Sequence, residues 1–168
     1  MNWLYDINRD NSVRFTLGEY KNKSEKTLIC FGINPSTASP QNLDNTVKKV
    51  KVLALNNGYK NWIMLNIYPQ RATNPNDLHL VCDNNLRTLN LDYIEKVLSA
   101  FTNSDILFAY GNLITKRKYL NDNLNGIITL IKSSNWNGLC LCIKLTKMGN
   151  PIHPLYQNNN SKFICFSI

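Results

Sequence analysis

The sequence predicts an α/β domain: a three-layer α/β/α sandwich whose central sheet is mostly parallel. Two observations lead to this prediction. Four short apolar runs are bounded by polar or turn residues, as buried strands are. Between these runs, apolar residues recur every three or four positions, which is typical of amphipathic helices. Strands that alternate with helices form βαβ units, and the strands of such units pair in parallel.

The expected strands follow one another along the chain. Val13 to Tyr20 is predicted as the first strand, and a polar connection follows it. The four apolar runs occupy residues 28–33, 62–67, 106–110 and 139–145. Their β-branched, aromatic and sulfur-containing side chains favour strands. A further short strand is expected over 127–131.

Helices are expected between these runs. Asp44 and Gly58 enclose a stretch with helical periodicity, so we expect a helix that Asp44 caps and that the glycine ends. A longer pattern of the same kind predicts a helix over 86–101. A third, weaker pattern predicts a helix from Asn112 to about Leu124.

The length of 168 residues suits a single domain, and no repeat or linker divides the chain. The hydrophobic share of 43% excludes a disordered protein. Nineteen Lys and Arg against 11 acidic residues give a net charge of +8, which is compatible with a nucleic-acid partner. The 27 asparagines suggest an A/T-rich genome, which also explains part of this charge.

No apolar run approaches the roughly 18 residues of a membrane span, and the first residues do not resemble a signal peptide. We therefore expect a cytoplasmic protein with no membrane partner and, by default, a monomer. The five cysteines are odd in number and are interpreted as reduced thiols. Cys140 and Cys142 alternate along a strand, so we expect no metal site, and nothing implies an organic cofactor.

Unusual polar and loop residues lie where the predicted strands end. These are Asn34, Asn66, Gly111 and His153. In an open α/β sheet, ligands bind in the crevice outside the carboxyl ends of the strands. We therefore expect these four chain segments to converge on one pocket.

Two short motifs carry a resemblance to a known superfamily. Gly32-Ile-Asn-Pro35 and His153-Pro-Leu155 resemble motifs of the uracil-DNA glycosylases, especially the mismatch-specific branch. Leu65-Asn66 and Tyr110-Gly111 stand, in the same order, where that superfamily has a base-reading segment and an aromatic-glycine pair. Only the order of such short motifs makes them moderately specific.

A second resemblance covers more of the chain. The string Gly-Ile-Asn-Pro-Ser-Thr-Ala over 32–38 is similar to an uncharacterised bacterial and phage family, domain of unknown function 1643. This resemblance extends from about Phe15 to Tyr156, and it implies a divergent relative of the glycosylases without supplying an activity. Ser36 in place of glycine, and Leu-Tyr after His-Pro, depart from the mismatch-specific pattern.

The glycosylase resemblance implies hydrolysis of the N-glycosidic bond of a damaged, mismatched or modified base. This chemistry needs a held water molecule and a donor near the base, which leaves as an anion. Asn34 is expected to hold the water, His153 to stabilise the leaving base, and Asn66 to pair with the base edge. Asp44 is the nearest carboxylate and a candidate helper, although an N-cap is the simpler interpretation.

Phe31 and Tyr68 are candidates for stacking on the base, and Gly111 completes the candidate base-binding residues. Core packing explains Phe31 equally well.

Four residues are candidates for contacts with DNA. Arg71 and Lys147 flank the strand ends and are candidates for phosphate contacts, although Arg71 can instead brace a loop. Leu155 or Tyr156 is the candidate wedge that fills the gap left by an extruded base. The alternatives are a core position for Leu155 and a surface position for Tyr156.

Three functions are compatible with these residues. The first is a DNA glycosylase-like enzyme that acts on duplex or single-stranded DNA. The second is a non-catalytic module that binds a nucleotide or nucleic acid in the same pocket. The third is hydrolysis of another small substrate, because a shared fold does not establish shared chemistry.

Overall fold

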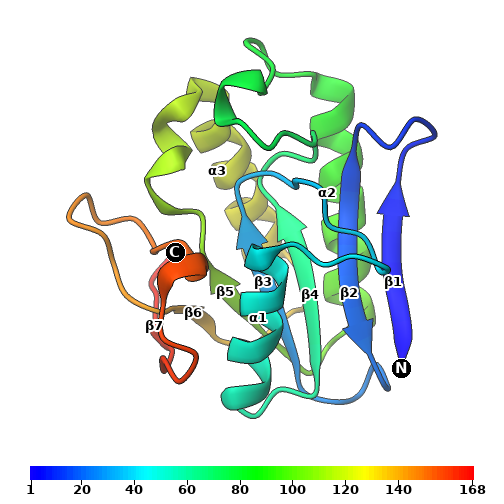
Figure 1. Cartoon of the computed structure of the whole chain (residues 1–168), viewed down its shortest axis with the longest axis vertical. Coiled ribbons are helices and arrows are strands. Elements are labelled where there is room, and N and C mark those ends of the chain that lie inside the picture. The colour runs from blue at the N-terminus through cyan, green and yellow to red at the C-terminus, as the bar shows by residue number, and fades with distance from the viewer.

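Seven strands form one mixed sheet in the computed structural model, which describes residues 1–168 (Figure 1). The strands are β1 (Asn2–Ile7), β2 (Arg14–Tyr20), β3 (Thr27–Gly32), β4 (Asn61–Asn66), β5 (Ser104–Phe108), β6 (Cys140–Cys142) and β7 (Ile164–Cys165). Their order across the sheet is β1-β2-β4-β3-β5-β6-β7. The central pairs β3–β4, β3–β5 and β5–β6 are parallel, and the other three pairs are antiparallel. The expected mostly parallel sheet is therefore parallel only at its centre.

Three α-helices connect the strands, together with three short 3₁₀ segments. They are α1 (Asn45–Asn56), α2 (Asn84–Ala100) and α3 (Lys118–Ser133), with η1 (Pro75–Asp77), η2 (Gly111–Lys116) and η3 (Pro154–Tyr156). The patterns that predicted α1 and α2 are confirmed. The helix predicted from Asn112 is instead η2 followed by α3.

The strand expected over 127–131 is wrong, because these residues belong to α3. Ile127 and Ile131 are buried and continue the apolar face that Leu120 and Leu124 begin. A short apolar run does not distinguish a strand from a buried helix segment by its periodicity alone. Strand β6 is also shorter than predicted, because the chain leaves the sheet after Cys142.

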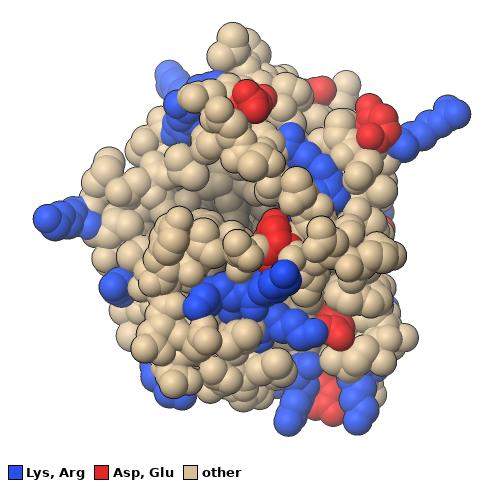
Figure 2. All heavy atoms as spheres, in the orientation of Figure 1, with Lys and Arg blue, Asp and Glu red and all other residues tan.

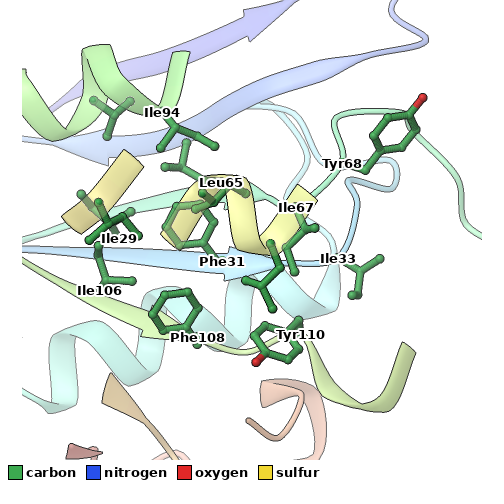
Figure 3. Close-up of a cluster of buried hydrophobic side chains, with 14 of the residues drawn as sticks. Ile29, Phe31, Ile33, Leu65, Ile67, Tyr68, Ile94, Ile106, Phe108 and Tyr110 are labelled. Carbon is green, nitrogen blue, oxygen red and sulfur yellow. The ribbon is translucent and has the colours of Figure 1, made fainter. Parts of the chain in front are cut away.

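The sheet separates two apolar layers, because neighbouring residues of a strand point to opposite faces. Helix α1 lies in front of the sheet in Figure 1, and α2 and α3 lie behind it. Cys30 and Met64 belong to a cluster of 15 buried residues that includes the apolar face of α1. Phe31 and Leu65 belong to the 20-residue cluster under α2 and α3, part of which is drawn in Figure 3.

Strand β2 contains one extra residue near its start. Asp6 pairs with Thr16 and Ile7 pairs with Arg14, so Phe15 has no partner on β1. This is the pattern of a β-bulge. The extra residue shifts the alternation along β2, so the residues before it point to the face opposite to the one that simple alternation predicts. Phe15 stacks on Tyr93 of α2, with ring centroids 4.4 Å apart. Arg14 can therefore face the opposite layer.

None of the helices is long and apolar enough to cross a membrane. All five cysteines are free thiols, and those of Cys30 and Cys142 are buried. Burial raises the pKa of the Cys30 thiol to about 12, so this side chain behaves as a small apolar group.

Candidate functional site

A cavity of about 160 Å³ lies at the carboxyl ends of β3 and β4, beside the first turn of α1. Figure 2 shows the hollow on this face of the molecule, above the N-terminal end of α1. Only five of the 16 lining residues are hydrophobic. Its walls therefore suit a small ligand with several polar groups.

The structure brings four predicted site residues to this one cavity. They are Asn34, Asp44, Asn66 and His153. Asn34 follows β3, and Asn66 is the last residue of β4. Asp44 and His153 precede α1 and η3 as their N-cap residues. The predicted convergence of separate strand ends is thus present.

Asn34 connects two loops at the rim of the cavity. Its Nδ2 group donates to the main-chain oxygens of Pro35, at 3.0 Å, and Ala72, at 2.8 Å. These two bonds fix the orientation of the amide and use both of its hydrogens. No protein donor reaches Oδ1 of Asn34, so this oxygen remains free to accept a hydrogen bond from a water molecule or ligand.

Asn66 is only 1% exposed, and its Nδ2 group has no hydrogen-bond partner. Its main-chain oxygen accepts a hydrogen bond of 2.9 Å from Asn90, which anchors the end of β4 to α2. A buried donor without a partner costs about 1–3 kcal/mol. A ligand in the cavity that accepts a hydrogen bond from Nδ2 would remove this cost.

His153 is held with one ring nitrogen facing its own loop. Its Nδ1 accepts a hydrogen bond of 3.3 Å from the main-chain N–H of Leu155. In the neutral ring the proton therefore lies on Nε2, which becomes a donor. Burial lowers the pKa of His153 below its usual 6.5, and the charge of Asp44 partly opposes this. The ring is consequently neutral at pH 7.

Gly111 supports the His153 loop without lining the cavity. Its N–H donates to the main-chain oxygen of Pro151 at 2.8 Å. Its φ of +61° lies in the left-handed region, which favours glycine. A Cβ atom at this position would lie 3.5 Å from Cβ of His153. Gly111 therefore lies against His153, and the base contact expected of Gly111 stays a prediction.

Asp44 combines a structural role with a place on the cavity wall. Its Oδ1 accepts a hydrogen bond of 2.9 Å from the N–H of Val47, which is an N-cap contact. The favoured interpretation as a cap is therefore confirmed. The other carboxylate oxygen makes no hydrogen bond with the protein, so it remains available in the cavity.

Two aromatic candidates do not reach the cavity. Phe31 is fully buried and stacks on Phe108, with centroids 5.7 Å apart, as Figure 3 shows. Tyr68 is also buried, and its hydroxyl is hydrogen-bonded to Nδ1 of His79 at 2.7 Å. Phe31 misses the cavity because it points to the α2/α3 face, whereas the cavity lies on the other side. Core packing, the alternative for Phe31, is what the structure shows.

Arg71 is half-buried and braces the loop after β3. Its guanidinium donates to the main-chain oxygens of Ser36 and Ala38, and to the hydroxyl of Tyr5 at 3.0 Å. These bonds agree with the loop-bracing alternative, and the phosphate contact of Arg71 stays a prediction. The acceptors are carbonyl and hydroxyl oxygens, not an internal acid.

The other three DNA-contact candidates lie on loops. Lys147 is exposed, on the loop between β6 and η3 that projects from the molecule in Figure 1. Leu155 is half-buried, and Tyr156 is 89% exposed. In Figure 2, several Lys and Arg side chains gather in a band below the hollow, over α1, and others are scattered around the edge of the molecule.

The sequence interpretation missed Arg14, which also lines the cavity. This residue is 1% exposed, and the only hydrogen bond of its side chain runs from Nη1 to the main-chain oxygen of Ala38, at 3.3 Å. Burial and the neighbouring Arg71 lower the pKa of Arg14 to about 10, whereas Asp44 opposes the change. Arg14 therefore stays charged at neutral pH. The sequence does not single out Arg14, because Arg14 and Thr16 occupy the polar positions of a strand that alternates with Val13, Phe15 and Leu17.

Comparison with known proteins gives one match. The model of a family described as "Protein of unknown function (DUF1643)" matches residues 14–155, a span that contains every cavity residue named above. No curated protein matches the sequence. Neither comparison connects the chain with the uracil-DNA glycosylase superfamily, so that resemblance rests on the motifs alone.

Proposed function

We propose that this chain, which belongs to the DUF1643 family of proteins of unknown function, binds a nucleobase in its cavity and hydrolyses the N-glycosidic bond of that base. This is the activity of a DNA glycosylase, and the motif resemblance to the uracil-DNA glycosylases supports it. One observation carries the proposal: Asn34, Asn66 and His153 line the same cavity. Their order along the chain is the order that the resemblance requires.

The size of the cavity favours a single base as ligand. Its volume of about 160 Å³ is smaller than the roughly 300–1,000 Å³ of pockets for drug-sized ligands. A base inside a duplex cannot enter such a space without leaving the stack. The proposed enzyme would therefore act on an extruded base or on single-stranded DNA.

His153 would stabilise the leaving base. When the bond between C1′ and the base nitrogen breaks, its electron pair stays with the base, and negative charge spreads to the base carbonyl oxygens. The Nε2–H group of a neutral His153 can donate a hydrogen bond to one of these oxygens. Stabilising a developing charge with one placed donor contributes about 10²–10³-fold in rate.

Asn34 and Asp44 would serve the attacking water. The free Oδ1 of Asn34 can accept a hydrogen bond from the water whose oxygen bonds to C1′. An amide cannot remove the proton, so a carboxylate is needed for that step. The oxygen of Asp44 that is not used in the cap lies on the same cavity and can take this proton. Asn66 would pair with the base edge through its unpartnered Nδ2.

Contacts with DNA would come from the rim. Tyr156 is 89% exposed and lies three residues after His153, which suits a side chain that fills the gap left by an extruded base. Lys147 is exposed on the adjacent loop and can meet a phosphate. The net charge of +8 is compatible with this partner.

A base-release screen tests the proposal. Purified protein is incubated with single- and double-stranded oligonucleotides that carry uracil, hypoxanthine, mismatched, oxidised or alkylated bases, and free base is measured. We expect release from one class of substrate and a loss of about 10²–10³-fold in His153→Gln. His79→Gln is the matched control, because the other histidine faces Tyr68 and not the cavity. Release by His153→Gln at the wild-type rate would contradict the proposed role.

A non-catalytic binding module is the second candidate, and one observation favours it. Both amide hydrogens of Asn34 and one oxygen of Asp44 already hold the protein scaffold together. In a module, these residues shape the pocket and perform no chemistry. Saturable binding of a base or nucleotide, without release from any oligonucleotide in the screen, would favour this function over the enzyme.

A further inference from the structure

Arg14 is a charged side chain that the proposed reaction does not use. It lies on the cavity wall and is 1% exposed. The molecule has only two ion pairs, Lys26–Asp105 and Lys51–Glu19, and neither involves Arg14. A buried charge without a counterion is strongly unfavourable, so buried charges are normally paired. Asp44 lies close enough to influence the pKa of Arg14 but is not within ion-pair distance.

Most of the hydrogen-bonding capacity of Arg14 is unused. The guanidinium carries five N–H donors, and one of them reaches a protein acceptor, the main-chain oxygen of Ala38. Nε is buried without any partner, and no hydrogen bond involves Nη2. Nε and Nη2 form one edge of the planar group. Two parallel N–H donors on such an edge match the two oxygens of a carboxylate or phosphate.

The neighbouring Arg71 also has a buried Nε without a partner, and it differs from Arg14 in its terminal nitrogens. Arg71 directs its two terminal nitrogens to main-chain oxygens and to Tyr5, so its fork is occupied by the protein itself. The extra residue Phe15 in β2 gives Arg14 a different direction from the one that simple strand alternation predicts. A bulge that turns a charged group toward a cavity indicates a binding role.

Asn66 supplies a second, independent unpartnered donor. Its Nδ2 is buried without a hydrogen bond, and its side chain lines the same cavity as Arg14. Nε2 of His153 is a third donor in this space. A ligand that contacts these three donors must supply hydrogen-bond acceptors. A negative charge on the same ligand would also neutralise the positive charge of Arg14.

We propose that Arg14 and Asn66 form an oxyanion subsite, and that the cavity takes a nucleobase or nucleotide that places a carboxylate or phosphate group against them. This proposal depends on the proposed function only for the base part of the ligand, which is the part that His153 contacts. The oxyanion belongs either to a substituent on the base or to the phosphate of the nucleotide. In both cases, two of its oxygens bind the Nε–Nη2 edge and one accepts from Asn66.

Calorimetric titration with matched probes tests this subsite. Uracil is compared with orotate, which is the same ring with an added carboxylate, and uridine is compared with uridine monophosphate. Inorganic phosphate is the fifth probe. The variant is Arg14→Met, and the control is Arg9→Met, which removes the same charge from an exposed position in the loop after β1.

We expect one charged probe to bind roughly 10- to 100-fold more tightly than its neutral partner, as for a hydrogen bond to a charged group. This preference should persist in Arg9→Met and disappear in Arg14→Met. Preference for orotate locates the oxyanion on the base, and preference for the monophosphate locates it on the nucleotide. Equal binding of charged and neutral probes, or a preference that survives in Arg14→Met, would overturn the subsite.

The same titrations separate this subsite from the proposed function. Uracil that binds as well as orotate, together with uridine that binds as well as its monophosphate, leaves the base pocket standing and overturns the subsite. Phosphate that binds only when Arg14 is present, with no binding of uracil, supports the subsite and overturns the base pocket. Should Arg14→Met fail to fold, Arg14→Lys keeps the charge but loses the paired donors. In that variant the preference should shrink without vanishing, and an undiminished preference would count against the subsite.

Discussion

The two faces of the sheet are built for different purposes, although the same strands supply both. On the α2/α3 face, Phe31 and Leu65 lie in an apolar cluster of 20 buried residues. On the α1 face, the next residues of the same strands, Gly32 and Asn66, line a cavity. Because neighbouring residues point to opposite faces, one strand end can hold the fold together and present a ligand site.

The difference lies in hydrogen bonding as well as in apolar packing. Five buried side-chain atoms in the molecule have no partner, and those of Arg14 and Asn66 belong to the cavity wall. Asn90 on α2 has an unpaired oxygen, but its Nδ2 bonds to the main chain of Asn66. Asn123 on α3 likewise has an unpartnered Nδ2, but its Oδ1 accepts a hydrogen bond from Cys82. The two buried amides on the α2/α3 face are thus each half satisfied, whereas the Asn66 side chain at the cavity makes no hydrogen bond.

The largest expected effect lies on the α2/α3 face. Phe31→Ala removes a fully buried ring that stacks on Phe108, so we expect the free energy of unfolding to fall by about 3–5 kcal/mol. Urea denaturation followed by circular dichroism measures this change. A loss below about 1 kcal/mol would mean that Phe31 is not a core residue and that the two faces are less distinct.

A paired substitution at Asp44 separates its cap from its place on the cavity. Asp44→Ala should lower the free energy of unfolding by about 1 kcal/mol, because the N–H of Val47 loses its acceptor. Asp44→Asn keeps a good cap and should leave stability nearly unchanged, while base release falls because the carboxylate is lost. Full activity of Asp44→Asn would show that Asp44 is only a cap.

At Asn66 we expect function and stability to change in opposite directions. Asn66→Leu replaces an unpartnered buried amide with an apolar group of similar shape, so the free energy of unfolding should stay constant or rise by up to about 1 kcal/mol. Base binding should be lost. A clear loss of stability in chemical denaturation would indicate that the amide supports the fold in the absence of any ligand.

The smallest expected effect is the pH dependence contributed by His153. Its pKa is lowered by burial, so below the usual 6.5 the unfolded chain binds this proton more readily than the folded chain does. The free energy of unfolding should therefore decrease as pH falls through this range. Comparison of wild type with His153→Gln at pH 7 and pH 5 isolates the contribution. A larger decrease in the variant would contradict a lowered pKa.

Much of the sheet could be predicted from the sequence, because its central strands are buried on both sides. The runs that became β3, β4 and β5 are apolar throughout, and the Asp44 cap marks the start of α1. Strand β1 was not predicted, because most of its residues are exposed or half-buried at the edge of the sheet. Its apolar pattern is correspondingly weak.

The site was predictable only in part. Asn34, Asn66 and His153 could be grouped because the carboxyl ends of parallel strands meet at one edge. Arg14 could not be grouped with them from the sequence, because the direction of its side chain depends on the bulge at Phe15. Simple alternation along β2 would place Arg14 on the α2/α3 face, away from the cavity. The contacts of Arg71 with Ser36 and Tyr5 join parts of the chain that are distant in sequence, so no local sequence pattern predicts them.

We infer that the cavity keeps the side-chain amide of Asn66 unpartnered for a ligand. NMR of the side-chain amide groups tests it directly, with the Asn66 signal pair identified by its absence in Asn66→Leu. We predict that saturating orotate or uridine monophosphate shifts this pair and slows its hydrogen exchange, while the amide of Asn90 on the opposite face is unchanged. Ligand binding that leaves the Asn66 pair unmoved would contradict the account.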